Sequence, residues 1–366
     1  MMTKEQIIHA LSHVEEPDLG KDLVTLNMVK DIEIDGENKV SFTVVLTTPA
    51  CPLKDLIRNA CINAVKHFVN KEAVVTVNMT ANVNSNRKDN KGALPGVRNV
   101  IMVASGKGGV GKSTVAANLA ISLGQGGAAV GLMDADVYGP SVPIMFGARG
   151  ERPMMVSVDG KAMISPLEKF GIKFMSIGLL VDEKQAIVWR GPMVSSALRQ
   201  FVTDVYWGDL DYLIIDMPPG TGDVQLTLVQ TVPVTGAVMV TTPQDVALLD
   251  AKKGIAMFSS PQINVPIIGL VENMAYFTPK ELPDNKYYIF GKEGGKRLAS
   301  EMDIPFLGQI PLVQGIREGG DYGQPVMTGD DEITKKAFID LAGATARGIA
   351  MRNANMAPTK IVEIMV

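Results

Sequence analysis

The chain has 366 residues, of which 46% are hydrophobic and 20% charged, so it is long enough to bury a large core. Its formal net charge of −4 argues against a general binder of nucleic acid or of anionic membranes. No apolar run approaches the length of a membrane span, and the first residues lack the apolar core of a signal peptide. With only two cysteines, Cys51 and Cys61, a disulfide scaffold is excluded and the reducing cytoplasm is the expected compartment.

The first 82 residues predict a small α+β unit in the order helix, strand, strand, helix, strand. Thr3 and Gln6 have the spacing of a capping box, which opens the first helix. Asp35-Gly36 is a hairpin signal. The strand that follows alternates apolar residues with polar ones, as a half-buried strand does, at Val40, Phe42, Val44 and Leu46.

Residues 83–97 are rich in asparagine, glycine and charge, and they predict a linker to a second unit at 98–366. In that unit short apolar strands alternate with helices, which predicts an α/β fold with a mostly parallel sheet covered on both faces. The expected strands lie at 100–104, 128–133, 212–215, 237–240 and 267–271, and the expected helices at 112–125, 245–258, 293–302 and 332–352.

A glycine-rich segment at 106–113 matches the pattern G-x-x-x-x-G-K-S/T between a strand and a helix, the context of a phosphate loop. Successive backbone N–H groups of such a loop surround phosphate oxygens, and the positive end of the helix faces the same anion. Here these groups belong to Gly106, Lys107, Gly108, Gly109, Val110 and Gly111. Lys112 is expected on the outer phosphates, the Ser113 hydroxyl on Mg²⁺ and Thr114 on a further phosphate oxygen. The motif predicts that the chain binds ATP and hydrolyses it.

The loop carries a second lysine, Lys107, directly after its first glycine, which an ordinary phosphate loop does not require. A positive charge at this position can stabilise the charge of the transition state, as an arginine finger does. A solvated surface lysine is the alternative, and the spacing leaves both open.

Acidic residues follow two of the apolar strands. Asp216 ends the run Leu-Ile-Ile-Asp, a Walker-B pattern that places a carboxylate beside Mg²⁺. Of Asp134 and Asp136, one is expected to position the attacking water and the other to be a cap or turn residue. The three histidines all lie in the N-terminal part, so hydrolysis must rest on carboxylates, lysine and Mg²⁺. These histidines are His9, His13 and His67.

The run Gly-Lys-Gly-Gly-Val-Gly-Lys-Ser-Thr, with its extra lysine, resembles the deviant Walker-A ATPases, which include MinD, ParA and the nitrogenase iron protein. Three further runs are similar to the Mrp/ApbC branch of ATP-dependent iron–sulfur cluster carriers: 134–141, 189–193 (Trp-Arg-Gly-Pro-Met) and 214–223. The N-terminal unit resembles the small iron–sulfur assembly domain that is often fused to these carriers. Glu-Pro-Asp-Leu at 16–19 and Thr-Pro-Ala-Cys-Pro at 48–52 carry that likeness.

The resemblance implies a homodimer that works with an iron–sulfur scaffold and apo-protein recipients, without nucleic acid or membrane as partner. It also implies roles for matching residues. Lys107 would reach the partner subunit's nucleotide, Asp136 would be the first-switch residue, Asp216 would lie in the Mg²⁺ shell, Asp223 in the second switch, and Asn273, with the segment 311–312, would contact adenine. Lys107, Lys112 and Asp136 would thus be the catalytic residues.

Cysteine usage departs from the family pattern. Carriers of this branch usually hold a C-x-x-C pair soon after the Glu-Asn-Met run, but here 274–283 contain no cysteine, nor does anything after Cys61. A cluster usually needs four thiolates, and a dimer of this chain cannot supply them from its second unit. Cys51 is therefore the remaining candidate iron–sulfur ligand. Pro52 is expected to be the first residue of a helix to about Phe68, with Cys51 at its N-cap, where the positive helix end lowers a thiol pKa. The alternative is that Cys51 serves only to start the helix. Cys61 has the helical spacing of a core residue.

Three functions remain open on the sequence. The first is a dimeric ATPase that assists iron–sulfur cluster assembly or delivery. The second is a partitioning or positioning ATPase of the MinD or ParA kind, which needs a basic DNA-binding face or an amphipathic C-terminal helix. The segment 346–366 has few basic residues and is interrupted by Pro358. The third is a scaffold that ATP switches and that carries no cluster.

Overall fold

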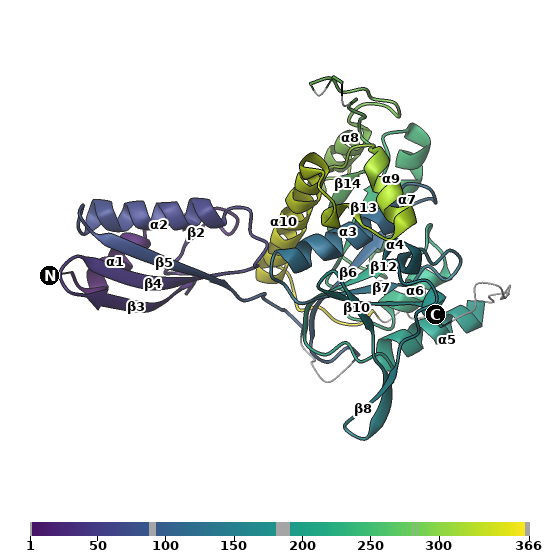
Figure 1. The fold of residues 1–366 in the computed structure, drawn as a ribbon, viewed down its shortest axis with the longest axis horizontal. Helices are drawn as coiled ribbons and strands as arrows, with labels where there is room; N and C mark the ends of the chain where they lie inside the picture. Colours follow the sequence, from purple (N-terminus) through teal and green to yellow (C-terminus); the bar gives the residue numbers. More distant parts are fainter. Residues whose placement is uncertain (1, 88–92, 181–190, 280, 283, 363–366) are drawn as a thin grey trace.

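The computed structural model describes residues 2–87, 93–180, 191–279, 281–282 and 284–362. Trp189 and Arg190 of the run at 189–193 lie outside this part. Figure 1 shows a small body on the left, formed by the N-terminal residues, and a larger body on the right. Each has its own hydrophobic core. We call residues 2–81 the small unit and 97–362 the large unit. In the described part of the chain, no helix is both long and apolar enough to span a membrane.

The small unit confirms the predicted order of elements. It contains α1 (Lys4–Leu11), β3 (Val29–Asp35), β4 (Lys39–Leu46), α2 (Lys54–Phe68) and β5 (Val74–Ala81), with a short extra pair, β1 (Glu15–Glu16) and β2 (Lys21–Asp22). β4 is the central strand, antiparallel to β3 across the turn at Gly36 and parallel to β5. The capping box is present, since Gln6 N donates to Thr3 Oγ1 at 3.3 Å and Thr3 N donates to Gln6 Oε1 at 3.0 Å.

The predicted start of the second helix is wrong. α2 begins at Lys54 with Leu53 as its N-cap, and no side chain caps it. Cys51 and Pro52 instead belong to a turn in which Lys54 N donates to Cys51 O at 3.3 Å. The fixed φ of proline suits the second position of a turn as well as the first turn of a helix, so the sequence pattern does not separate the two.

The large unit is built on an eight-stranded sheet in the order β10-β11-β7-β12-β6-β13-β14-β15. All neighbours are parallel except the edge strand β10, which confirms the predicted sheet. The strands are β6 (Val97–Ala104), β7 (Val130–Asp134), β10 (Leu167–Lys169), β11 (Ile172–Ser176), β12 (Leu210–Asp216), β13 (Gly236–Thr241), β14 (Ile267–Glu272) and β15 (Phe306–Gln309). The sequence had not predicted β10, β11 or β15, nor the separate hairpin of β8 (Met155–Val158) and β9 (Lys161–Ile164).

Helices cover both faces of this sheet, as right-handed crossovers require. α3 (Lys112–Gln125) connects β6 to β7 in one direction along the sheet. The other crossover helices run in the opposite direction and so cover the opposite face: α5 (Gly191–Thr203), α6 (Asp223–Val229), α7 (Asp245–Ser259) and α8 (Gly294–Glu301). α10 (Glu332–Asn355) packs on α3, where Ser122 Oγ donates to Phe338 O at 3.3 Å. The short α4 (Val142–Met145) and α9 (Gln314–Tyr322) contact each other.

The described parts of the segment predicted as a linker, 83–87 and 93–97, pack along the large unit. Val83 and Leu94 are buried in the core of that unit, and β6 begins already at Val97. Asn86 Nδ2 donates to Met356 O at 2.9 Å, which ties the segment to the end of α10. A few well-placed apolar residues therefore fix a segment whose composition is otherwise polar.

A core substitution tests the large unit. Phe174 on β11 is fully buried, and its ring lies 4.8 Å from that of Phe146 in an edge-to-face contact. We expect Phe174→Ala to lower the free energy of unfolding by about 3–5 kcal/mol in urea denaturation. Leu249→Ala, at a side chain 62% exposed on α7, should change it by less than about 0.5 kcal/mol. Equal losses in the two variants would contradict this packing.

Candidate nucleotide-binding site

The candidate site lies at the edge of the sheet where the parallel strands end. The phosphate loop, 105–111, joins β6 to α3 at this edge. Gly109 and Gly111 have φ of 81° and 79°, a left-handed conformation that side chains other than hydrogen resist. Thr114, in the first turn of α3, is half-buried.

Two further contacts leave no room for a side chain at Gly106 or at Gly111. A Cβ on Gly106 would lie 2.1 Å from the carbonyl carbon of Asp250 on α7, and one on Gly111 would lie 2.2 Å from Asn273 Nδ2. The loop is therefore held between the sheet and α7 at a separation that only glycine permits.

Asn273 has a role that the sequence analysis missed. It follows β14, is 5% exposed, and its Nδ2 donates to Val110 O at 2.8 Å. The side chain therefore holds the phosphate loop in place. Its expected contact with adenine stays a prediction.

A buried lysine lies at the centre of the site. Lys112 Nζ, in a side chain 6% exposed, lies 2.5 Å from Asp216 Oδ1, 3.1 Å from Ser113 Oγ and 3.7 Å from Asp136 Oδ2. Burial raises the pKa of Asp216, and the neighbouring Lys112 opposes that rise. The structure thus brings three of the predicted site residues, Ser113, Asp136 and Asp216, around the cation of a fourth, Lys112.

Two carboxylate oxygens in this group accept no hydrogen bond. Asp216 Oδ2 and Asp136 Oδ1 are buried and have no partner among the described residues. A buried carboxylate oxygen without a partner is costly, and a cation or an ordered water would satisfy it. The donor set, carboxylates and the Ser113 hydroxyl, consists of the hard oxygen ligands that Mg²⁺ prefers. The residues present therefore fit a magnesium ion.

Asp134 is the turn residue of the first acidic pair. Its Oδ1 accepts from Asp136 N at 3.1 Å, and its Oδ2 accepts from Ser176 Oγ at 2.8 Å and from Val142 N at 3.3 Å. Burial, with the nearby Asp216 charge adding to it, raises the pKa of Asp134 to about 7. Its bonds shape the turn that presents Asp136 to Lys112.

The two residues assigned to switches share a cavity of about 460 Å³ beside the site. Asp136 and Asp223, the first residue of α6, both line it. Lys107 is half-buried on the phosphate loop and forms no ion pair with any residue in the described part of the chain. Its charge is therefore available to a group outside the chain.

Gln225 is a second residue that sequence reasoning missed. Its side chain is buried, and Nε2 donates to Pro218 O at 2.9 Å and to Gly220 O at 3.0 Å. Gly222 N donates to Gln225 Oε1 at 2.9 Å. The glutamine thereby fixes the loop after Asp216, and its place three residues after Gly222 is the capping-box spacing that could have revealed it.

The prediction for Cys61 is confirmed, and the one for the pKa of Cys51 is wrong. Cys61 is fully buried in the small core, as predicted, and burial raises its pKa to about 12. The prediction that the pKa of Cys51 is lowered is wrong, because burial raises it and the thiol does not lie at a helix start. Among the described residues, Cys51 belongs to no group of three or more His, Cys, Asp or Glu side chains that could hold a metal.

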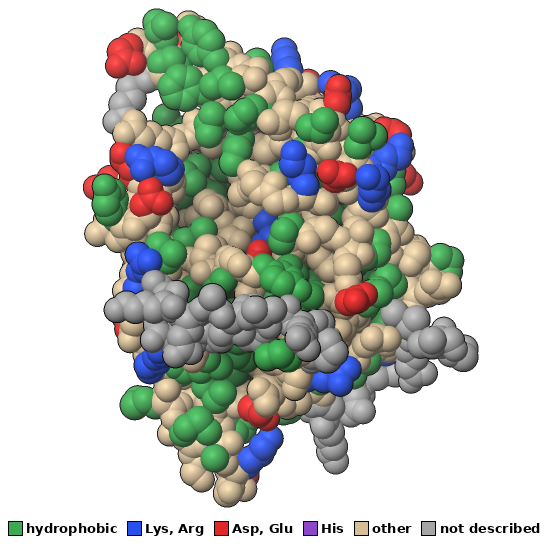
Figure 2. All heavy atoms as spheres, turned by 90° about the vertical axis from the view of Figure 1, so that its right-hand side faces the viewer, with side chains coloured by type: hydrophobic (Ala, Val, Ile, Leu, Met, Phe, Trp, Pro, Cys, Tyr) green, Lys and Arg blue, Asp and Glu red, His purple; other side chains and the backbone are tan. Residues whose placement is uncertain are grey.

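The described residues of 274–289, a segment that includes the stretch where the family pattern places C-x-x-C, expose several apolar side chains. Phe277 and Tyr287 exchange two backbone hydrogen bonds of 2.8 Å, and Leu282 and Ile289 are exposed nearby. Figure 2 views the molecule from the right-hand side of Figure 1 and shows hydrophobic side chains gathered at the top. Lys280 and Pro283 lie outside the described residues.

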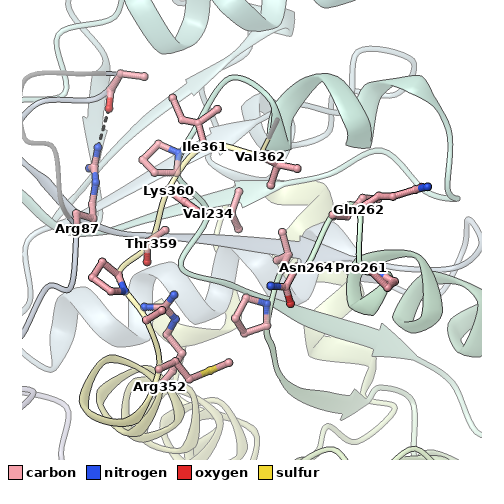
Figure 3. A pocket seen from close by; sticks show the side chains of 18 residues that line it. Arg87, Val234, Pro261, Gln262, Asn264, Arg352, Thr359, Lys360, Ile361 and Val362 are labelled. Carbon is pink, nitrogen blue, oxygen red and sulfur yellow. Dashed lines mark hydrogen bonds between the residues drawn. The ribbon is translucent and has the colours of Figure 1, made fainter. Parts of the chain in front are cut away.

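A larger cavity, of about 740 Å³, lies at the opposite end of the strands, where β13 and β14 begin (Figure 3). Segments that precede β13 and β14 line it, together with Arg352, Thr359 and the residues that follow. Since these segments enter the strands at their amino ends, this cavity is separate from the phosphate loop.

A glycine loop between strand and helix, a buried lysine in that helix, and an aspartate ending a neighbouring parallel strand define a P-loop nucleotide-binding protein. The family model described as NUBPL iron-transfer P-loop NTPase matches residues 96–346, and the one described as iron–sulfur cluster assembly protein matches residues 4–79. The chain belongs to the family of NUBPL-type iron-transfer P-loop NTPases.

Individual relatives agree with this assignment. The chain is 47% identical to an iron–sulfur cluster carrier protein of Synechocystis, over 96% of this chain and 99% of that one. It is 50% identical to a mitochondrial iron–sulfur protein required for NADH dehydrogenase of Arabidopsis thaliana, over 70% and 80%. The structure of a nucleotide-binding protein from Archaeoglobus fulgidus, in complex with ADP, is 37% identical and superposes with a TM-score of 0.56, over 66% of this chain and 93% of that one.

The close contacts of the loop give a direct test. In Gly106→Ala the added methyl group collides with the backbone at Asp250, so we expect nucleotide affinity to fall by at least tenfold in calorimetric titration with ATP. Gly315→Ala on α9 is the matched control, because nothing lies within 4 Å of the added carbon. Wild-type affinity in Gly106→Ala would show that the loop tolerates displacement from α7.

Proposed function

We propose that this chain is a Mg²⁺-dependent ATPase that acts as a homodimer and assists the assembly of iron–sulfur clusters or their transfer to apo-proteins. The observation that carries the ATPase part is the buried Lys112–Asp216 pair, with two unpaired carboxylate oxygens beside a glycine loop. The names of the relatives support the iron–sulfur part over a partitioning role. Two free cysteines fit work in the reducing cytoplasm.

An exchange of partners at Lys112 begins the reaction. When a triphosphate enters the loop, Nζ leaves Asp216 Oδ1 for the outer phosphate oxygens. Asp216 and the Ser113 hydroxyl are the residues that would hold a magnesium ion, which would supply positive charge against the phosphate oxygens. Asn273 keeps the loop in register and, with the segment 311–312, contacts the adenine.

Hydrolysis follows by positioning and electrostatics. Asp136 Oδ1 accepts a hydrogen bond from the attacking water and orients it toward the γ-phosphorus. A bond forms from the water oxygen to that phosphorus as the bond to the bridging oxygen breaks, ADP takes the bridging electrons, and one proton of the water passes to an oxygen of the released phosphate. Lys107 of a second copy stabilises the charge on the transferring group, so turnover depends on the dimer.

The iron–sulfur cluster is the cargo in this scheme, and Cys51 is its ligand. A dimer contributes two Cys51 thiolates, and further thiolates come from the donor or recipient protein. Since burial disfavours the thiolate of Cys51, the cluster is held less tightly than by an exposed low-pKa thiol, which suits transfer. A chain that takes up no cluster would instead be the ATP-switched scaffold.

Lys107 supplies the first test of this proposal. We expect Lys107→Gln to lower steady-state ATP turnover by at least a factor of about 100 while ATP binding persists, because the charge acts on the transition state. Lys252→Gln, at an exposed lysine paired with Glu301, should turn over ATP at the wild-type rate. Unchanged turnover in Lys107→Gln removes the in-trans role, and an inactive wild type favours the scaffold.

Cluster binding is tested by anaerobic reconstitution with iron and sulfide, followed by metal analysis and an absorption spectrum. We expect wild type and Cys61→Ala to take up a cluster and Cys51→Ala to take up none. A wild type without iron and sulfide would replace the carrier proposal with a regulatory one. Equal uptake in Cys51→Ala would move the site elsewhere.

A further inference from the structure

The three-stranded sheet of the small unit has two edge strands, β3 and β5, that differ in their chemistry (Figure 1). β3 carries four charged side chains in seven residues. Its register with β4 shifts between Lys30 and Glu33, and Asp31 has a φ of 50°. Charged side chains and bulges prevent an edge strand from pairing with another chain. β3 is therefore a protected edge.

β5 has no such protection. Its eight residues, Val-Val-Thr-Val-Asn-Met-Thr-Ala, contain no charge, no proline and no glycine, and their pairing with β4 runs without a shift. A long, regular and uncharged edge strand is a template on which a further strand can pair. Since the same sheet protects its other edge, the lack of protection at β5 indicates that this edge has a use.

The backbone of β5 shows which of its groups are open. Val74 N donates to Asn38 O at 2.8 Å, and Asn82 N donates to Leu46 O at 2.9 Å, so the even-numbered residues bond to β4. Because the backbone groups of a strand alternate in direction, those of the odd-numbered residues point away from β4. In the described part of the chain, no hydrogen bond reaches their N–H groups. These residues are Val75, Val77, Met79 and Ala81.

The inner face of the sheet is also incompletely covered at β5. The apolar side chains that β4 turns inward, at alternate positions from Val40 to Leu46, are at most 3% exposed. On β5 the inward side chains of Val75, Val77 and Met79 pack on the same core but are only half-buried. A further strand with apolar residues at every second position would cover them, and burial of apolar surface is the main favourable term in association.

A cavity of about 420 Å³ adjoins the start of this edge. It lies between the C-terminal half of α2 and the first residues of β5, where Ile62 and Val75 contribute apolar side chains. Lys66 and Lys71 also line it, and neither forms an ion pair with any residue that the structure describes. Glu72 is the one acidic residue among its described lining residues. The cavity therefore combines an apolar wall with an excess of positive charge.

We propose that the outer edge of β5 binds an extended segment of another protein, which adds a fourth strand to this sheet. The segment exchanges backbone hydrogen bonds with the odd-numbered residues of β5. Its alternate apolar side chains cover the inner face beside α2, and an acidic side chain near its end lies against Lys66 and Lys71. In this mode of binding, main-chain bonds give affinity and the side chains at every second position give selectivity. Such binding requires neither ATP turnover nor a cluster.

A second copy of this chain is a poorer occupant of the edge. If two β5 strands paired around a two-fold axis, the start of one would face the end of the other, which Asn82 and Val83 follow. No residue of β5 itself is acidic. Lys66 and Lys71 would then gain no partner of opposite charge. The charge at the cavity therefore favours a different protein that carries an acidic residue in an extended segment.

Two fluorescent peptides of ten residues serve as probes. Both alternate valine and threonine, and a pair of glutamates stands at the amino end of one and at the carboxyl end of the other. We expect the full chain to bind one of them in fluorescence anisotropy. About four amides of 74–81 should then gain protection in hydrogen exchange, because only the odd-numbered N–H groups are open. The same peptide with N-methyl groups at alternate residues should bind at least about tenfold more weakly.

Variants of the chain separate the backbone bonds from the charge. Val77→Pro removes an N–H group that bonds to no described residue, and edge strands tolerate proline, so the sheet is retained. We expect it to weaken binding of the better probe at least about tenfold. The double variant Lys66→Glu with Lys71→Glu leaves the edge intact and should weaken binding about fivefold. Lys4→Glu, which reverses the charge of an exposed lysine on α1, should bind as wild type does.

Failure of both probes to bind, or binding without added protection in 74–81, would overturn the docking site. Wild-type affinity in Val77→Pro would show that no strand is added at this edge. A molecular mass of two chains without nucleotide, which Val77→Pro returns to one chain in light scattering, would replace the partner protein with a second copy. Because none of these readouts involves ATP or iron, their outcome is separate from that of the function proposed above.

Discussion

The buried ion pair between Lys112 and Asp216 is the interaction on which the rest of the site depends. Two charges removed from water are costly unless their geometry is good and their remaining atoms find partners. Here the lysine comes from the start of α3 and the aspartate from the end of β12, so the pair adds a side-chain link where Gly220 N already donates to Ser105 O at 2.9 Å. Parallel strands are needed for this, because only they bring their carboxyl ends to one edge.

Glycine residues also hold parts of the structure together, because they allow close contacts where a side chain would not fit. Gly106 and Gly111 let α7 and Asn273 approach the phosphate loop, and Gly126 and Gly343 let the small unit approach the large one. The same helix, α3, thus has glycine contacts at both ends. This arrangement gives the small unit a defined position relative to the phosphate loop.

Much of the fold and the centre of the site could be predicted because they follow local rules. Apolar strands such as β12 and the capping box at Thr3 carry their own periodicity or spacing. The start of α2 could not be placed, since proline suits a turn and a helix alike. The partial burial of Cys51 and the hydrogen bond from Asn273 to Val110 arise from residues far apart in the chain, which no local pattern contains.

The Lys112–Asp216 ion pair also affects the interpretation of experiments in which the phosphate-loop lysine is replaced. Replacing Lys112 with alanine removes a phosphate ligand, but it also leaves the carboxylate of Asp216 buried without its cation. Breaking a buried pair in this way costs about 3–5 kcal/mol of folding stability. When a Lys112 variant is inactive in the cell, the cause is therefore either loss of folded protein or loss of nucleotide binding. Only measurements on purified, folded protein separate the two.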